Sequence, residues 1–143
     1  MTDESPSPPP PSCPSARPEM AQSVIFGVVG GTVAEPRVGY LEKALPVTPE
    51  ILALSGPVAP GEVFRFAAPC AGGGCQHFDG ARCRLAQRVV AELPVAVDRL
   101  PPCRLRPTCV WWKQEGVEAC RRCPQIVSEN LAPTAELVLA ATP

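Results

Sequence analysis

Hydrophobic positions in the first half of the chain fall in short alternating runs that predict β-strands. Ser23–Val29 is rich in β-branched and aromatic residues and ends at two glycines, which predicts a strand followed by a turn. Thr32–Leu41 is expected to return as a second strand. Pro36 restricts that strand to a sheet edge, because proline has no N–H to donate to a neighbouring strand. The alternation across Glu62–Ala67 predicts one further strand.

Helical signals come before and after this last strand. A hydroxyl residue, a proline and an acidic residue in succession predict a short helix at Pro49–Leu54. A longer amphipathic helix is predicted at Ala81–Leu93, with Asp79 as its N-cap. Cys83 would then lie in the first turn, where the helix dipole favours a thiolate.

Both ends of the chain have a composition that differs from the middle. Residues 1–21 hold seven prolines among serine and acidic residues, so they are expected to form a disordered arm. Cys13 lies within that arm and is interpreted as a bystander. Residues 129–143 are expected to be a C-terminal tail that forms one short docked helix or nothing stable.

The residues between these ends predict one small domain with an α+β fold. Residues 22–128 are expected to form a single metal-binding domain, with a β-rich part at 22–69 and a cysteine-rich part at 70–128. The small N-terminal β layer would be followed by a metal-stapled module with short helices.

The expected compartment decides what the cysteines mean. The chain opens on acidic residues and prolines with no basic and apolar leader, and its first apolar run is too short to cross a bilayer. We therefore expect a cytoplasmic protein with no membrane partner. Cysteine clusters in a reducing compartment indicate metal or redox chemistry more often than disulfides.

Seven of the eight cysteines lie between residues 70 and 123, and the single histidine lies among them. Such a set is enough for two four-ligand metal sites. Order along the chain predicts one site at Cys70, Cys75, His77 and Cys83 and another at Cys103, Cys109, Cys120 and Cys123. An interleaved partition, or a single centre that uses four of the cysteines, remains an alternative.

The spacing of the last two cysteines bears on the identity of the metal. We expect a helix from Thr108 to Glu115 and another at Val117–Cys123, which would place Cys120 and Cys123 on one face. The sequence Cys-x-x-Cys-Pro at this point resembles the end of bacterial ferredoxin cluster motifs. The full ferredoxin spacing is absent, so the chain is not assigned to that family.

The remaining intervals favour iron–sulfur ligation over zinc. They are irregular, and three glycines between Cys70 and Cys75 allow backbone amides to turn toward sulfur. We expect one or two 4Fe-4S clusters, with Zn²⁺ as the alternative. Trp111 and Trp112 would shield a cluster from water or anchor a small core.

Charge and residue types limit the possible functions. Residues 70–123 have a net charge of +4, whereas the whole chain has −1, which favours charge compensation near thiolates over a nucleic-acid surface. One histidine and one tyrosine leave little acid–base chemistry, and no catalytic residue is assigned. The sequence predicts an electron carrier or an accessory subunit of a larger redox enzyme. A zinc-stabilised interaction module without catalysis is the alternative.

Overall fold

A four-stranded antiparallel sheet forms one layer of the protein. The computed structural model describes residues 11–32, 35–126 and 134–142. The strands are β1 (Ser12–Ala16), β2 (Val24–Gly31), β3 (Pro36–Pro46) and β4 (Phe64–Pro69), in the spatial order β1-β4-β2-β3. The expected α+β fold is therefore confirmed, and β3, which carries Pro36, is an edge strand as predicted.

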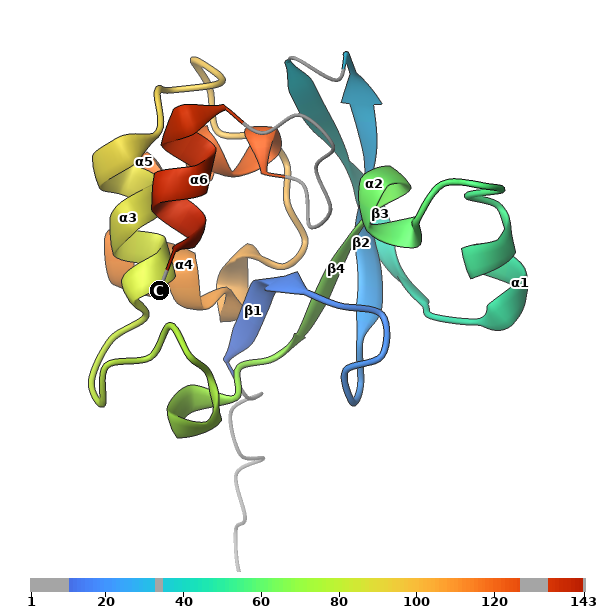
Figure 1. Ribbon diagram of the computed structural model, residues 1–143, viewed down its shortest axis with the longest axis horizontal. Helices are drawn as coiled ribbons and strands as arrows, with labels where there is room; N and C mark the ends of the chain where they lie inside the picture. The colour runs from blue at the N-terminus through green and yellow to red at the C-terminus, as the bar shows by residue number, and fades with distance from the viewer. Residues whose placement is uncertain (1–10, 33–34, 127–133, 143) are drawn as a thin grey trace, which may run out of the picture.

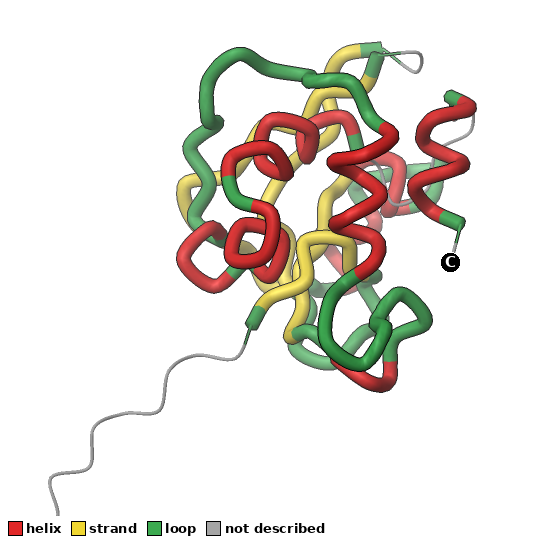
Figure 2. The backbone as a smooth tube through the Cα atoms, turned by 90° about the vertical axis from the view of Figure 1, so that its left-hand side faces the viewer, coloured by secondary structure: helices red, strands yellow, loops and turns green. Residues whose placement is uncertain are grey.

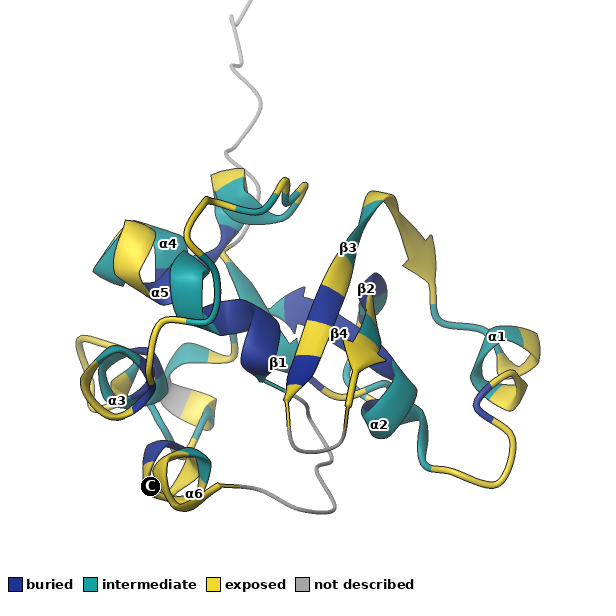
Figure 3. Ribbon diagram, turned by 90° about the horizontal axis from the view of Figure 1, so that it is seen from above, coloured by how far each residue is buried: buried dark blue, intermediate teal, exposed yellow. Residues whose placement is uncertain are grey.

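Short helices cover the sheet on two sides (Figure 1). On one side lie α3 (Arg84–Glu92), α4 (Val110–Glu115), α5 (Val117–Arg122) and α6 (Ala135–Ala141). On the other side lie α1 (Pro49–Ala53) and α2 (Pro60–Val63), as the view from above also shows (Figure 3). Three single turns of 3-10 helix complete the chain: η1 (Gly72–Gly74), η2 (Arg106–Thr108) and η3 (Cys123–Gln125).

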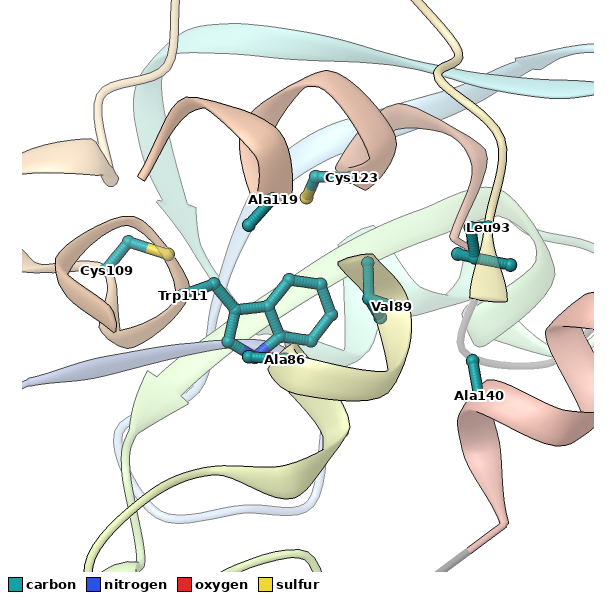
Figure 4. Packing of buried hydrophobic residues seen from close by; sticks show 8 residues of the cluster. All are labelled: Ala86, Val89, Leu93, Cys109, Trp111, Ala119, Cys123 and Ala140. Atoms are coloured by element: carbon teal, nitrogen blue, oxygen red, sulfur yellow. The ribbon is translucent and has the colours of Figure 1, made fainter. Parts of the chain in front are cut away.

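Two hydrophobic clusters fill the space between these layers. Ile25, Phe64 and Phe66 belong to the first cluster, against which residues of α1 and α2 pack. Trp111 is only 2% exposed and belongs to the second cluster, which joins α3, α4, α5 and α6 and includes two cysteines (Figure 4). A substantial part of the second core is therefore built around thiols.

The N-terminal segment corrects one sequence expectation. Residues 12–16 form β1, which pairs with β4, so the prediction of a disordered arm over residues 1–21 is wrong for this segment. Residues 1–10 lie outside the described residues. β1 occupies the free edge beside β4, where the lack of an N–H on Pro14 is tolerated.

The helix after the glycine-rich turn also differs from expectation at its start. It begins at Arg84, and the Cys83 sulfur accepts the Ala86 N–H at 3.5 Å as the N-cap. Asp79 instead accepts from the backbone N–H groups of Ala81 and Arg82 and closes the preceding loop. Cysteine 109 similarly takes the N-cap position of α4 that was predicted for Thr108.

The C-terminal residues 134–142 include a docked helix. The helix α6 lies beside α3 (Figure 2). Ala140 of α6 is buried, and its carbonyl accepts from Arg88 Nε at 2.9 Å. The expected short docked helix is thus present, while residues 127–133 and 143 lie outside the described residues. Within the described ranges, no helix is long and apolar enough to cross a bilayer.

Close packing of β2 against β3 generates a test of this sheet. A Cβ on Gly27 would lie 2.5 Å from Val38 Cγ1, so we expect Gly27→Ala to lower the free energy of unfolding by about 1–3 kcal/mol. Gly39→Ala is the matched control on the paired strand, where the nearest atom is 3.9 Å away. Urea denaturation of both variants measures the difference. Equal losses would contradict the register.

Candidate metal centres

Four cysteines line a small cavity between β3 and the C-terminal helices. Cys103, Cys109, Cys120 and Cys123, here called the second cysteine group, line a cavity of about 20 Å³. Figure 4 shows the Cys109 and Cys123 side chains turned toward Trp111. Tyr40 reaches the same cavity from β3. These are the four cysteines that the sequence assigns to one metal site, and that assignment stays a prediction.

Burial and nearby donors have opposite effects on these thiols. Burial raises the pKa of Cys103 and of Cys120, while backbone N–H groups of Leu105 and Arg106 oppose the increase at Cys103 and the Arg106 side chain opposes it at Cys120. Backbone N–H groups of Trp112 and Trp111 act in the same lowering direction on the pKa of Cys109. Burial nevertheless dominates for Cys109 and raises its pKa to about 12, helped by the nearby Cys123 and Cys120. The thiols of Cys103, Cys109 and Cys120 are therefore protonated at neutral pH, and metal binding would displace those protons.

One fully buried arginine lies beside this group. Arg65 of β4 is 0% exposed, and its Nη2 donates to Cys123 Sγ at 3.3 Å. Nε donates to the Pro14 carbonyl at 2.8 Å, and Nη1 donates to the carbonyls of Cys123 at 2.8 Å and Ile126 at 3.1 Å. Burial lowers the pKa of Arg65, but the neighbouring Cys123 and Tyr40 raise it, and the outcome is a raised pKa. The guanidinium is therefore a permanent buried cation.

This cation has no carboxylate partner. In the described part of the chain, the ion pairs join Glu118 to Arg121 and to Arg122, and none reaches Arg65. The rings of Phe26 and Trp111 lie 5.4 Å and 6.0 Å from its central carbon. Buried charges in proteins are normally paired or coordinated to metals, so the environment of Arg65 fits an anionic group formed from these thiols.

A second set of cysteines borders a larger cavity of about 750 Å³. Its lining includes Cys70, Cys75, His77 and Cys83, the residues that the sequence places in one site. Cys13 lines the same cavity, although the sequence gave it no role. Burial raises the pKa of the Cys13 thiol to about 11, and the nearby Cys83, Cys70 and Cys75 add to the increase. The sequence alone did not indicate this placement of Cys13 beside the other cysteines.

Two contacts link the elements that carry the two sets of cysteines. Gln114 of α4 lies between the second-group cysteines in sequence, yet its side chain holds Cys83 by accepting from the Cys83 N–H and donating to the Cys83 carbonyl, both at 2.8 Å. The backbone of Ser12 in β1 forms an isolated β-bridge with that of Cys109, and Ser12 Oγ lies 2.9 Å from Thr108 Oγ1. The two groups are therefore neighbours, with β1 between them.

His77 makes a contact that bears on its predicted role. Its Nδ1 lies 2.8 Å from Nη2 of Arg88. Arginine can only donate, so Nδ1 must accept. Burial lowers the pKa of His77, and the Arg88 charge lowers it further. The imidazole is therefore neutral and carries its proton on Nε2.

Two buried N–H groups beside these cysteines bear on whether a metal–sulfur group would fit there. Trp111 lines both cavities and Arg106 lines the smaller one. Trp111 Nε1 and Arg106 Nε are buried without a hydrogen-bond partner among the described residues. Anionic sulfur would be a suitable acceptor for both donors. All eight cysteines are free thiols, and within the described ranges no three His, Cys, Asp or Glu side chains are already arranged to hold a metal ion.

Comparisons with known proteins add no relative. No family model matches the chain, and no curated protein or solved structure matches it. The candidate centres are therefore argued from their own geometry.

The contacts of Arg65 generate a stability test. Arg65→Lys keeps the charge but has a single nitrogen, which cannot reach Pro14, Ile126 and Cys123 together. We expect the free energy of unfolding to fall by about 2–4 kcal/mol. Arg37→Lys is the control, because Arg37 is exposed and bonds only the carbonyl of the preceding residue. Chemical denaturation checks both, and similar losses would argue against a special role for Arg65.

Proposed function

We propose that this protein is an iron–sulfur protein that carries electrons or serves as an accessory subunit of a larger redox enzyme. The observation that carries the proposal is a fully buried arginine that has no carboxylate partner among the described residues and donates to the sulfur of Cys123 within a group of four cysteines. A 4Fe-4S centre on four thiolates carries a net charge of about −2 and would complete this pairing.

Hydrogen bonding at the sulfurs supports iron–sulfur ligation. Donors to cysteine sulfur tune the reduction potential of such centres, and here Arg65 Nη2 donates to Cys123 Sγ and the Ala86 N–H donates to Cys83 Sγ. Trp111 is buried beside the second group and would keep water from the sulfurs.

The first group would supply a second centre through Cys70, Cys75 and Cys83. β1 contacts the second group through Ser12 and borders the first cavity through Cys13, so the two centres would be adjacent. Such centres would give the protein reversible one-electron transfer. Adjacent centres in a small domain suit passage of electrons between two protein partners, and we place this activity in the cytoplasm.

Zinc remains a second candidate because of the dimensions of the smaller cavity. A space of about 20 Å³ exceeds the ~10–15 Å³ that one water requires and accepts a single ion. The pair Cys120 and Cys123, three residues apart, is also a common zinc clip. In that case the protein would be a structural or interaction module without catalysis.

Optical absorption of protein purified without oxygen separates these candidates. We expect a broad band near ~400 nm that dithionite bleaches, with inorganic sulfide present in amounts similar to iron. Colourless protein that holds stoichiometric zinc and no sulfide would exclude the iron–sulfur proposal. The matched variants are Cys123→Ser and Cys75→Ser, each of which should remove about half of the metal. Loss of all metal from either one would exclude two independent centres.

Metal removal should also unfold part of the structure. Core packing around Trp111 includes Cys109 and Cys123, so a bound centre would hold α4 and α5 in place. A structural metal site contributes on the order of 10 kcal/mol to folding. After chelation under reducing conditions, we expect amide-exchange protection to be lost across residues 103–123 and partly kept in β2 and β4. Full protection in the apo-protein would show that the metal has no structural role.

A further inference from the structure

We infer that Cys13, on strand β1, is the fourth thiolate ligand of the first centre and that His77 is not a ligand. This inference rests on the proposed function only in requiring that the first group binds a metal centre. It changes the predicted ligand set to Cys13, Cys70, Cys75 and Cys83. Each of the two centres would then have four cysteines, and all eight cysteines of the chain would be used.

Strand pairing places Cys13 beside Cys70. Cys13 lies opposite Ala68 in the antiparallel register of β1 and β4, and the Cys70 N–H donates to the Pro11 carbonyl at 2.8 Å. Residues two apart on a strand point to the same face, so Cys70 continues the face of Ala68. Diagonal neighbours of this kind have Cα atoms roughly 7–8 Å apart, which is within reach of side chains that share a cluster.

The alternation along β1 separates the two centres. Cys13 and Ser15 line the larger cavity, whereas Pro14 between them lines the smaller one. Cys75 and Cys83 line the larger cavity with Cys13, and both are close enough to affect its thiol electrostatically.

The hydrogen bond of His77 is the reverse of what a metal ligand needs. A metal-bound imidazole uses one nitrogen for the metal and donates the N–H of the other to an acceptor. In His77 the second nitrogen faces Arg88, which is only a donor, so the proton lies on the nitrogen that would have to bind metal. Arg88 is held in turn by the Ala140 carbonyl at 2.9 Å. His77 is therefore an acceptor that orients Arg88 between α3 and α6.

Three single variants of the full chain test the assignment. Cys13→Ala removes the proposed ligand, and His77→Gln keeps an acceptor for Arg88 but removes the imidazole. Ser15→Ala is the matched control, because Ser15 lies on the same strand and lines the same cavity. Iron, zinc and sulfide per chain are measured after purification without oxygen, with circular dichroism as the check on folding.

We expect Cys13→Ala to lose about half of the metal, or to convert one centre to a three-iron form visible by electron paramagnetic resonance. His77→Gln and Ser15→Ala should keep the wild-type metal content and spectrum. Full metal content in Cys13→Ala, or loss of one centre from His77→Gln, would overturn the inference. If zinc replaces iron, a fall from two ions to one in Cys13→Ala still supports Cys13 as a ligand while excluding the iron–sulfur proposal. Wild-type protein that binds neither metal would overturn both.

A second measurement on the wild-type protein covers the case in which Cys13→Ala does not fold. Iodoacetamide treatment of the native, metal-loaded chain, followed by mass spectrometry, reports which thiols are blocked. We expect Cys13 to be protected together with Cys70, Cys75 and Cys83 and to react at least tenfold faster after chelation. Alkylation of Cys13 at the same rate before and after chelation would overturn the inference.

Discussion

A single buried cation connects the two layers of this protein. The Arg65 guanidinium projects from β4 and bonds the backbone of β1, the turn η3 and the Cys123 sulfur. A buried charge is costly unless every donor finds an acceptor, so these partners must be in place together. The sheet and the cysteine-bearing helices are therefore interdependent, and a change in the charge of Cys123 would be felt directly in β4 and β1.

This dependence explains why the predicted boundary between residues 69 and 70 separates two compositions but not two independent structural parts. Sequence patterns correctly predicted β2, the edge position of β3, the short α1 and the helices near Cys109 and Cys120, because each is encoded by neighbouring residues. In the sequence, Arg65 is simply one polar position in an alternating strand, and nothing next to it indicates burial. Its burial depends on β1 and η3, which are far from it in sequence, and no local pattern reports such contacts.

Cys13 was missed for a related reason. A proline-rich composition predicts disorder, yet an edge strand tolerates proline, and β1 is stabilised by pairing with β4 more than fifty residues away. The sequence does contain one signal that points to Cys13, namely the number of cysteines. Eight cysteines make two complete sets of four, whereas the predicted partition needed His77 and left one cysteine without a role. His77 was favoured by its position near Cys75, and only the contact with Arg88 argues otherwise.

The balance of charge around the thiols gives the strongest physical support for a metal centre. Burial raises the pKa of Cys13, Cys83, Cys103, Cys109 and Cys120, so without metal these residues are neutral and offer little to a nearby cation. The same region holds the Arg65 charge, for which the described residues offer no carboxylate, and two buried N–H groups, on Trp111 and Arg106, that have no acceptor among those residues. Each is unfavourable in an apo-protein. Replacing thiol protons with metal would create anionic sulfur, which would offer a partner to the cation and acceptors to the donors.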